Sequence, residues 1–157
     1  MKISAKVDYA LQAIVEIASM SQKDSLISTE EISHKRNIPE KFLEGILTSL
    51  CKAGVVNSYR GPSGGFELAK KPEDVFVADI IRIIDGPLAS IRGFAPEEIE
   101  YSGAVKHISD VWIATRVALR NVLENISIAE ILTGEFDANV SELLYKKGAW
   151  KRRRGNI

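Results

Sequence analysis

The 157-residue sequence has a single cysteine and no long hydrophobic run, and each shortage excludes a class of protein. The lone Cys51 excludes an intrachain disulfide framework and fits a reducing compartment. No apolar run approaches the roughly 20 residues that span a bilayer. Residues 1–6 lack the apolar core and the cleavage site of a signal peptide. The sequence therefore predicts a cytoplasmic protein that makes no contact with a membrane.

Metal-ligating and phosphate-binding motifs are also missing. The two histidines, His34 and His107, have no cysteine or histidine at the spacing of a zinc site. The phosphate-binding pattern G-x-x-x-x-G-K-[ST] does not occur. The sequence therefore predicts neither a metal site nor a nucleotide site of this kind.

Charge is balanced over the whole chain but not along it. The 21 basic and 21 acidic residues cancel, so total charge does not indicate a nucleic-acid partner. Residues 1–72 carry a net charge of +2, residues 73–145 carry −8, and residues 146–157 carry +6. Phosphate contacts are therefore expected at the two ends of the chain. The basic tail can attract phosphate whatever the base sequence, and the alternative is a disordered, solvated tail.

Residues 53–68 predict a β-hairpin directly after a helix. The β-branched and aromatic residues of 55–59 favour a strand, and the glycines and proline of 61–65 favour a tight loop. Residues 66–68 alternate in polarity and favour a returning strand. This arrangement is the wing of a winged helix–turn–helix. Arg60 at the base of the wing can reach phosphate or a groove edge, and the loop glycines allow close approach to a phosphate.

The same loop matches a second pattern. Residues 61–65 satisfy G-x-S-x-G, the nucleophile elbow of serine hydrolases, and Asp85 and His107 follow Ser63 in the order of a triad. That motif needs a helix after the serine, whereas the residues after Ser63 favour a strand. The wing is therefore the preferred interpretation, with a serine hydrolase as the alternative.

Three helices are predicted ahead of the hairpin. The first covers residues 4–21, and the second covers residues 28–35 after a capping box of Ser28 and Glu31. The third runs from Pro39 in its first turn to the stop at residue 54. Its expected core face consists of Phe42, Leu43, Ile46, Leu47 and Leu50.

The second and third predicted helices form a helix–turn–helix, whose second helix enters the major groove of DNA. Its expected outward residues are Glu40, Lys41, Glu44 and Gly45. Lys41 can pair with phosphate or a guanine edge, and Glu44 can accept from a cytosine amino group. The alternative is that these charges form a solvated helix face, but the hairpin behind the helix favours DNA.

The C-terminal half predicts a short helix over residues 77–85, a loop over 87–107 and one long helix over 108–126. Apolar residues of the long helix recur at steps of three and four, the spacing of a coiled-coil seam. Such a stripe must be buried, in part in the chain's own core and otherwise against a two-fold partner. A second capping box at Ser127 opens a helix that stops at Gly134. The expected dimer interface is Ile108, Val111, Trp112, Thr115, Leu119, Val122, Leu123 and Ile126.

Short motifs spread along the chain carry a family resemblance. They are KISAK at 2–6, YAL at 9–11, FLE at 42–44, KAGVV at 52–56, RGPSGGF at 60–66, ADII at 78–81, DGP at 85–87 and SIAEI at 127–131. Together they resemble the Rrf-two family of bacterial regulators, the group of the iron–sulfur regulator IscR, the nitric-oxide sensor NsrR and the cysteine-metabolism repressor CymR. The resemblance reaches about residue 134. It implies a homodimeric transcription regulator in which Glu44 reads a base and Arg60 enters the minor groove.

Cysteine content separates this chain from the cluster-binding relatives, which the resemblance says carry three cysteines in the segment matching residues 88–106. This chain has none there, and an iron–sulfur cluster commonly needs four thiolates. Asp8 matches a carboxylate that completes the cluster in some relatives, but without the cysteines we interpret it as a surface or capping charge. The expected cofactor is therefore none, and the pattern is closest to CymR-like members. Cys51 is expected to be an inert buried thiol, with a redox sensor activated by Lys52 as the alternative.

The sequence thus predicts a mostly α protein with a small β-wing. It divides into a winged helix–turn–helix domain over 1–86, a linker or sensor loop over 87–107, a dimerisation helix and a C-terminal helix over 108–145, and a basic tail over 146–157. The expected function is a homodimeric DNA-binding regulator, a repressor, without catalytic residues. The alternative is a protein-interaction module controlled by a partner enzyme. Expected partners are double-stranded DNA, a second copy, and a corepressor protein or small-molecule effector. Expected DNA contacts are Ser28, Thr29, Pro39, Glu40, Lys41, Glu44, Tyr59, Arg60, Gly61, Ser63, Gly64 and Gly65.

Overall fold

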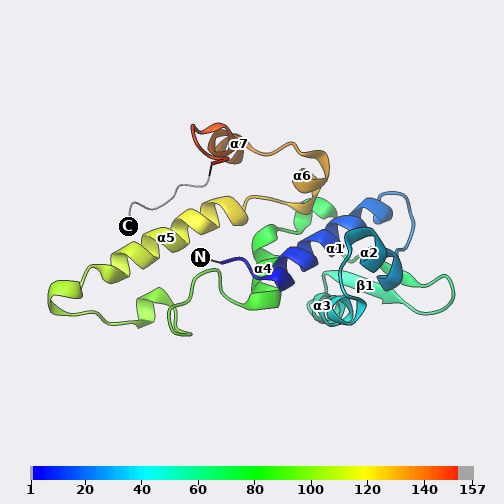
Figure 1. Cartoon of the computed structure of the whole chain (residues 1–157), viewed down its shortest axis with the longest axis horizontal. Coiled ribbons are helices and arrows are strands. Elements are labelled where there is room, and N and C mark those ends of the chain that lie inside the picture. Colours follow the sequence, from blue (N-terminus) through cyan, green and yellow to red (C-terminus); the bar gives the residue numbers. More distant parts are fainter. Residues whose placement is uncertain (1, 152–157) are drawn as a thin grey trace.

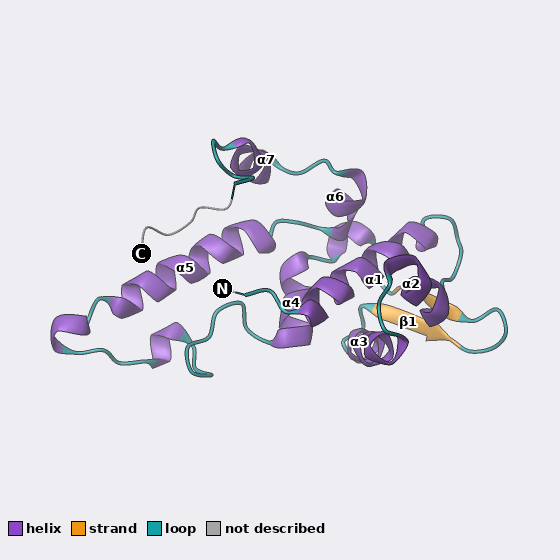
Figure 2. Cartoon of the chain, in the orientation of Figure 1, coloured by secondary structure: helices purple, strands orange, loops and turns teal. Residues whose placement is uncertain are grey.

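The computed structural model describes residues 2–151 and places nearly all of the regular structure in helices (Figures 1 and 2). The helices are α1 Ala5–Ser21, α2 Thr29–Arg36, α3 Glu40–Lys52, α4 Val77–Asp85, α5 Ile108–Leu123, α6 Ile128–Thr133 and α7 Ala138–Tyr145. Strands β1 Val56–Tyr59 and β2 Gly65–Leu68 pair antiparallel. This confirms the predicted fold class, a mostly α chain with one small wing.

Helix α1 is the centre of the core, because α2, α3, α4, α6 and β2 all contact it. Its buried side chains include Val7, Ala10, Ile14 and Ala18 at three- and four-residue spacing, and Ser4 caps its start by accepting from the Val7 N–H at 3.1 Å. Burying this stripe removes apolar area from water, at about 25 cal/mol per Å². The core residues that surround α1 are Ile27, Ile32, Ile38, Leu43, Ile46, Leu47, Leu50, Ile80 and Ile128.

The hairpin, which we call the wing (β1, β2 and the loop 60–64), is joined to the helices at two points. Ile27, just before α2, pairs with Phe66 of β2 through hydrogen bonds in both directions, at 2.9 and 3.3 Å. The Leu68 N–H donates to the Ser21 hydroxyl at the end of α1, at 3.1 Å. The wing therefore has a fixed orientation relative to the helix–turn–helix.

Residues 87–126, which we call the arm, leave the core after α4 and return to it before α6. On the return, the Ile128 N–H donates to the Val75 carbonyl and the Val77 N–H donates to the Ile126 carbonyl, each at 2.9 Å. Helix α6 then packs on α1, with Ile128 fully buried. Figure 1 shows α5 extending to one end of the molecule, with the wing at the opposite end.

Two sequence expectations are wrong in detail. The long helix stops at Leu123, so Ile126 lies in the connection to α6 and forms no part of a helical seam. Phe42 is 45% exposed and is not on the core face of α3. Helix α7, capped by Asp137, follows α6 and was not predicted from the sequence. Of the predicted basic tail, residues 146–151 are described and the rest lie outside the described residues.

Among residues 2–151, no helix combines the length and the apolarity that crossing a lipid bilayer requires.

Candidate nucleic-acid interface

Helix α2 begins with the predicted capping box. The Ser28 hydroxyl accepts from the Glu31 N–H at 3.2 Å, and the Glu31 carboxylate accepts from the Ser28 N–H and hydroxyl, both at 2.8 Å. These hydrogen bonds lower the pKa of Glu31 below its usual value of 4.5. Ser28 is therefore engaged in capping, and Thr29 is the first helical residue, partly exposed.

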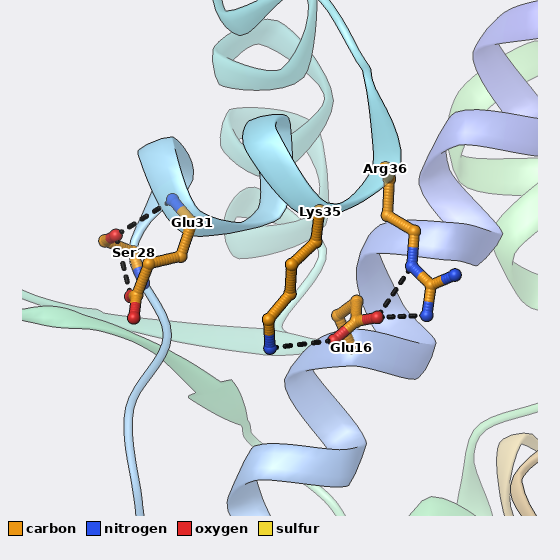
Figure 3. A network of polar contacts seen from close by, with 5 residues as sticks. All are labelled: Glu16, Ser28, Glu31, Lys35 and Arg36. Carbon is orange, nitrogen blue, oxygen red and sulfur yellow. Dashed lines mark hydrogen bonds and ion pairs between the residues drawn. The ribbon is translucent and has the colours of Figure 1, made fainter.

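A buried carboxylate on α1 holds the other end of α2 (Figure 3). Glu16 is only 7% exposed, and its Oε1 accepts from Arg36 Nε at 2.6 Å, with Arg36 Nη2 also in contact. Lys35 Nζ lies 3.5 Å from the other carboxylate oxygen. A buried charge needs such partners, since desolvation otherwise penalises it heavily. The pair fixes the end of α2, from which the turn leads into α3.

The turn between α2 and α3 is short and well satisfied. Asn37 adopts the left-handed conformation at φ 52°, which asparagine tolerates better than most residues. The Ser33 hydroxyl donates to the Ile38 carbonyl at 2.7 Å, and Ile38 is buried. Pro39 is exposed at the cap of α3 rather than inside its first turn. This geometry sets α3 against α2 as a helix–turn–helix.

Helix α3 presents charged side chains to solvent. Glu40, Lys41 and Glu44 are exposed, and in the part of the chain that the structure describes their charged groups have no ion-pair or hydrogen-bond partner. Phe42 lies on one flank, packed edge-to-face on Tyr9 of α1 with ring centroids 5.8 Å apart. The outward charges are thus available to a ligand, as predicted, and Phe42 adds an apolar surface beside them that the sequence analysis assigned to the core.

The wing loop exposes Arg60, Gly61 and Ser63, while the glycines after them have internal roles. A Cβ on Gly64 would collide with the wing's own backbone, and one on Gly65 would come within 2.8 Å of the Ile27 carbonyl oxygen. Gly65 was predicted to contact DNA, but it is buried and is not positioned to do so. Glycine is therefore needed at both positions for packing. The wing backbone approaches itself closely at Gly64, and it approaches Ile27 closely at Gly65.

Tyr59 is tied across the wing to the facing strand. Its hydroxyl donates to the Glu67 carboxylate at 2.6 Å, and this bond raises the pKa of Tyr59. Arg60, directly after it, has no ion-pair partner among the described residues. The wing therefore holds one aromatic side chain in place and leaves its arginine free to bind a partner.

The arm presents an apolar helix that its own protomer covers poorly. No residue of α5 is fully buried, and Val111 and Val117 are 57% and 46% exposed. Trp112, Leu119 and Leu123 instead face the body, where with Ile3, Ile81 and Leu88 they line a cavity of about 490 Å³. Thr115 also lines this cavity, whereas Val111 and Val122 do not and remain on the outer side. The predicted interface residues are therefore divided between two sides of α5.

The serine-hydrolase alternative is wrong. Ser63 lies in the wing loop and β2 follows it, whereas a nucleophile elbow requires a helix at that point. Cys51 is half-buried near the end of α3, and burial raises the pKa of its thiol. A raised pKa disfavours the reactive thiolate. The described residues therefore offer no activated nucleophile at either position.

The comparisons with known proteins agree with this geometry. Residues 3–134 match the model of the Rrf2 family, described as iron-dependent transcriptional regulators. A Mycobacterium tuberculosis protein, named as a candidate HTH-type transcriptional regulator, is 38% identical over 91% of this chain and 88% of its own length. CymR of Bacillus subtilis, an HTH-type transcriptional regulator, is 31% identical over 83% of this chain and 89% of its own.

Solved structures give the same result. The structure of CymR, titled the global cysteine regulator of B. subtilis, superimposes with a TM-score of 0.72 at 29% identity, covering 86% of this chain and 98% of CymR. The structure of T. potens IscR gives a TM-score of 0.68 at 30% identity, covering 85% and 88%.

The family description includes iron, so the donor residues need testing. Iron–sulfur clusters are held chiefly by thiolates. Residues 87–107 contain no cysteine, and the described residues include no group of three or more His, Cys, Asp or Glu placed to share a metal ion. The residues present therefore do not fit an iron–sulfur cluster.

The helix–turn–helix, the wing and the match over most of the chain agree with one another. The chain belongs to the Rrf2 family, and it is a DNA-binding winged-helix regulator of transcription and not an enzyme.

Proposed function

We propose that the chain is a homodimeric repressor that binds a pseudo-palindromic operator without an iron–sulfur cluster. The observation that carries the DNA-binding mode is the set of exposed, unpaired charges on α3 and the wing. Lys41, Glu44 and Arg60 have no partner among the described residues, whereas the nearby Glu16, Glu31 and Glu67 all do. Charged side chains without internal partners, on a helix–turn–helix and its wing, suit an external ligand.

In this proposal α3 lies in the major groove and the wing reaches the minor groove. Lys41 contacts phosphate or a guanine edge, and Glu44 accepts from a cytosine amino group. Arg60 enters the minor groove, whose negative potential attracts arginine. Pro39, Glu40, Gly61 and Ser63 lie beside these residues and supply backbone or phosphate contacts.

The proposed dimer contact is the outer side of α5. Val111, Ala118 and Val122 follow one another at steps of seven and four, so they form one stripe on the helix. Val111 is 57% exposed in the single protomer, and neither of the other two is buried. Two such stripes packed about a two-fold axis would place two wings at opposite ends of a symmetric dimer, as a palindromic site requires.

The signal that controls the repressor is proposed to be a corepressor protein or a small molecule, acting in the cytoplasm. The cavity lined by Trp112 and Leu119 supports a small-molecule effector, since it lies where the arm meets the body. A protein-interaction module without DNA binding is the competing function.

Selection of bound fragments from the source genome, followed by affinity measurements at several salt concentrations, tests the proposal. A specific operator with two related half-sites, bound by a dimer, is the expected result. The observed affinity should fall steeply with salt, because counterions are released from each neutralised phosphate. Binding that is absent, or independent of salt, would favour the protein-interaction module.

A further inference from the structure

Gly45 stands in the middle of the recognition helix α3, where glycine is a costly residue. Glycine in a helix interior is less favourable than alanine, because it loses more backbone freedom on folding. A structural reason within the chain would be a neighbour that leaves no room for a side chain. At Gly45 a Cβ would meet nothing within 4 Å, and the backbone is ordinary α-helix. The fold of the protomer therefore gives no reason for this glycine.

The other glycines of the site differ from Gly45. Gly64 and Gly65 both have backbone atoms where a Cβ would stand, and Gly61 has a positive φ of 113°. Each of these three positions is explained by the wing itself. Gly45 is thus the one glycine of α3 and the wing, both fully described, whose absent side chain has no intramolecular explanation.

Gly45 also lies at the centre of the outward face of α3. Lys41 is four residues before it, and Thr48 and Lys52 are three and seven residues after it, so all four lie on one side of the helix. The hydroxyls of Thr48 and Ser49 turn back to the Glu44 and Gly45 carbonyls, at 2.8 and 3.0 Å. The surface between the two lysines is therefore nearly flat over about 16 Å along the helix axis.

We infer that Gly45 sets how closely the recognition helix approaches the floor of the major groove, and thereby sets specificity. This inference rests on the proposed function. The missing side chain lets the α3 backbone come near the base edges, while Lys41 and Lys52 hold phosphates on either side. A methyl group at residue 45 would hold the helix away from the bases that Glu44 must reach. Phosphate contacts through long, flexible lysines would survive such a shift.

Replacement of Gly45 by alanine tests this inference because stability and affinity should change in opposite directions. Gly45→Ala is expected to raise the urea midpoint of unfolding, since alanine favours the helix and meets no neighbour. Its affinity for the selected operator should fall by at least tenfold, while its affinity for unrelated duplex DNA should change less than twofold. Gly45→Gln should lose more operator affinity than Gly45→Ala.

Asn139→Ala is the matched control, because it places alanine at an exposed position of α7, away from α3 and the wing. It should raise stability without changing operator affinity, which separates helix propensity from the groove contact. Operator affinity of Gly45→Ala within twofold of wild type would overturn the inference, and so would equal losses on operator and unrelated DNA. Failure of the wild-type protein to bind any operator would instead reject the proposed function.

Discussion

Arg36 at the end of α2 is paired with Glu16, a nearly buried carboxylate in the middle of α1, twenty residues earlier in the chain. Arg36 Nε donates to Glu16 Oε1 at 2.6 Å, and Lys35 approaches the second oxygen. The two cations are about half exposed, whereas the acid is enclosed (Figure 3). The pair therefore fixes the helix–turn–helix on the core.

Glu16→Gln should lower the free energy of unfolding by about 1–2 kcal/mol, less than for a fully buried pair, because the cations can be hydrated when the acid is lost. Urea denaturation of Glu16→Gln, Arg36→Gln and the double variant measures this change in the free energy of unfolding. Because the residues touch, the double variant should lose less stability than the two single variants combined. Strictly additive losses would show that the pair contributes nothing to stability.

The capping box of α2 predicts a pH dependence. Hydrogen bonds to Ser28 depress the pKa of Glu31, so its ionised form stabilises the folded state above the unfolded pKa, and this contribution is lost as pH falls through the folded pKa. Glu31→Gln should therefore be less stable than wild type at pH 7, and the difference should shrink below pH 4.5. Glu30→Gln, an exposed change in the same turn, is the control. A difference that is constant from pH 7 to pH 3 would contradict the expectation.

The Cys51 thiol should react slowly in the folded protein. Burial raises its pKa above the usual 9.0, so the thiolate is scarcer at pH 7 than in an unfolded chain. Iodoacetamide should alkylate the folded protein at least about tenfold more slowly than the urea-unfolded protein. Rapid alkylation of the folded protein, or oxidation of Cys51 by dilute peroxide, would revive the redox-sensor alternative.

The sequence predicted correctly the features that depend on interactions between residues close together in the chain. The capping boxes at Ser28 and Ser127, the cap at Ser4 and the hairpin glycines all act within a few residues, and the structure has each of them. The Glu16–Arg36 pair was missed because it joins residues twenty apart whose meeting depends on how α2 packs on α1.

Other errors came from surfaces that periodicity cannot resolve. Phe42 has the spacing of a core residue, yet it lies on a flank, packed on Tyr9 and 45% exposed. Periodicity gave α5 one wide apolar stripe, and only tertiary structure shows that Trp112 and Leu119 face the body while Val111 faces solvent. The packing role of Gly65 could not be predicted because its backbone neighbour, Ile27, is distant in the sequence, and that of Gly64 depends on how the wing loop folds back on Tyr59 and Gly61.

Val111→Asp should convert the proposed dimer into a monomer. Val111 is more than half exposed on the outer side of α5, so a carboxylate there is harmless to the protomer but would be desolvated in a helix–helix contact. Sedimentation velocity at micromolar concentration measures the change, and operator affinity should fall because both half-sites are no longer bound together. Tyr145→Asp, at an exposed aromatic residue of α7, should leave the dimer intact. A Val111→Asp protein that stays dimeric would remove this side of α5 from the interface.

Arg60→Ala isolates the contribution of the wing. Arg60 is exposed and has no internal partner among residues 2–151, so its loss should leave the urea midpoint unchanged. The free energy of operator binding should become less favourable by about 1–3 kcal/mol if the guanidinium contacts a base or a narrow minor groove. Fluorescence anisotropy on operators that differ only beneath the wing distinguishes two kinds of contact. A groove contact predicts that the loss depends on those bases, whereas a phosphate contact predicts a uniform loss and a salt slope reduced by about one.

Lys106→Ala is the matched control for the charge change, because Lys106 is an exposed cation of the arm, outside α3 and the wing. Both variants remove one positive charge, so both weaken the long-range attraction to DNA by similar amounts. Only the Arg60 variant should lose discrimination among the operators. Equal affinities for the two variants on every operator would mean that the wing arginine acts through net charge alone, and α3 would then carry all of the base recognition.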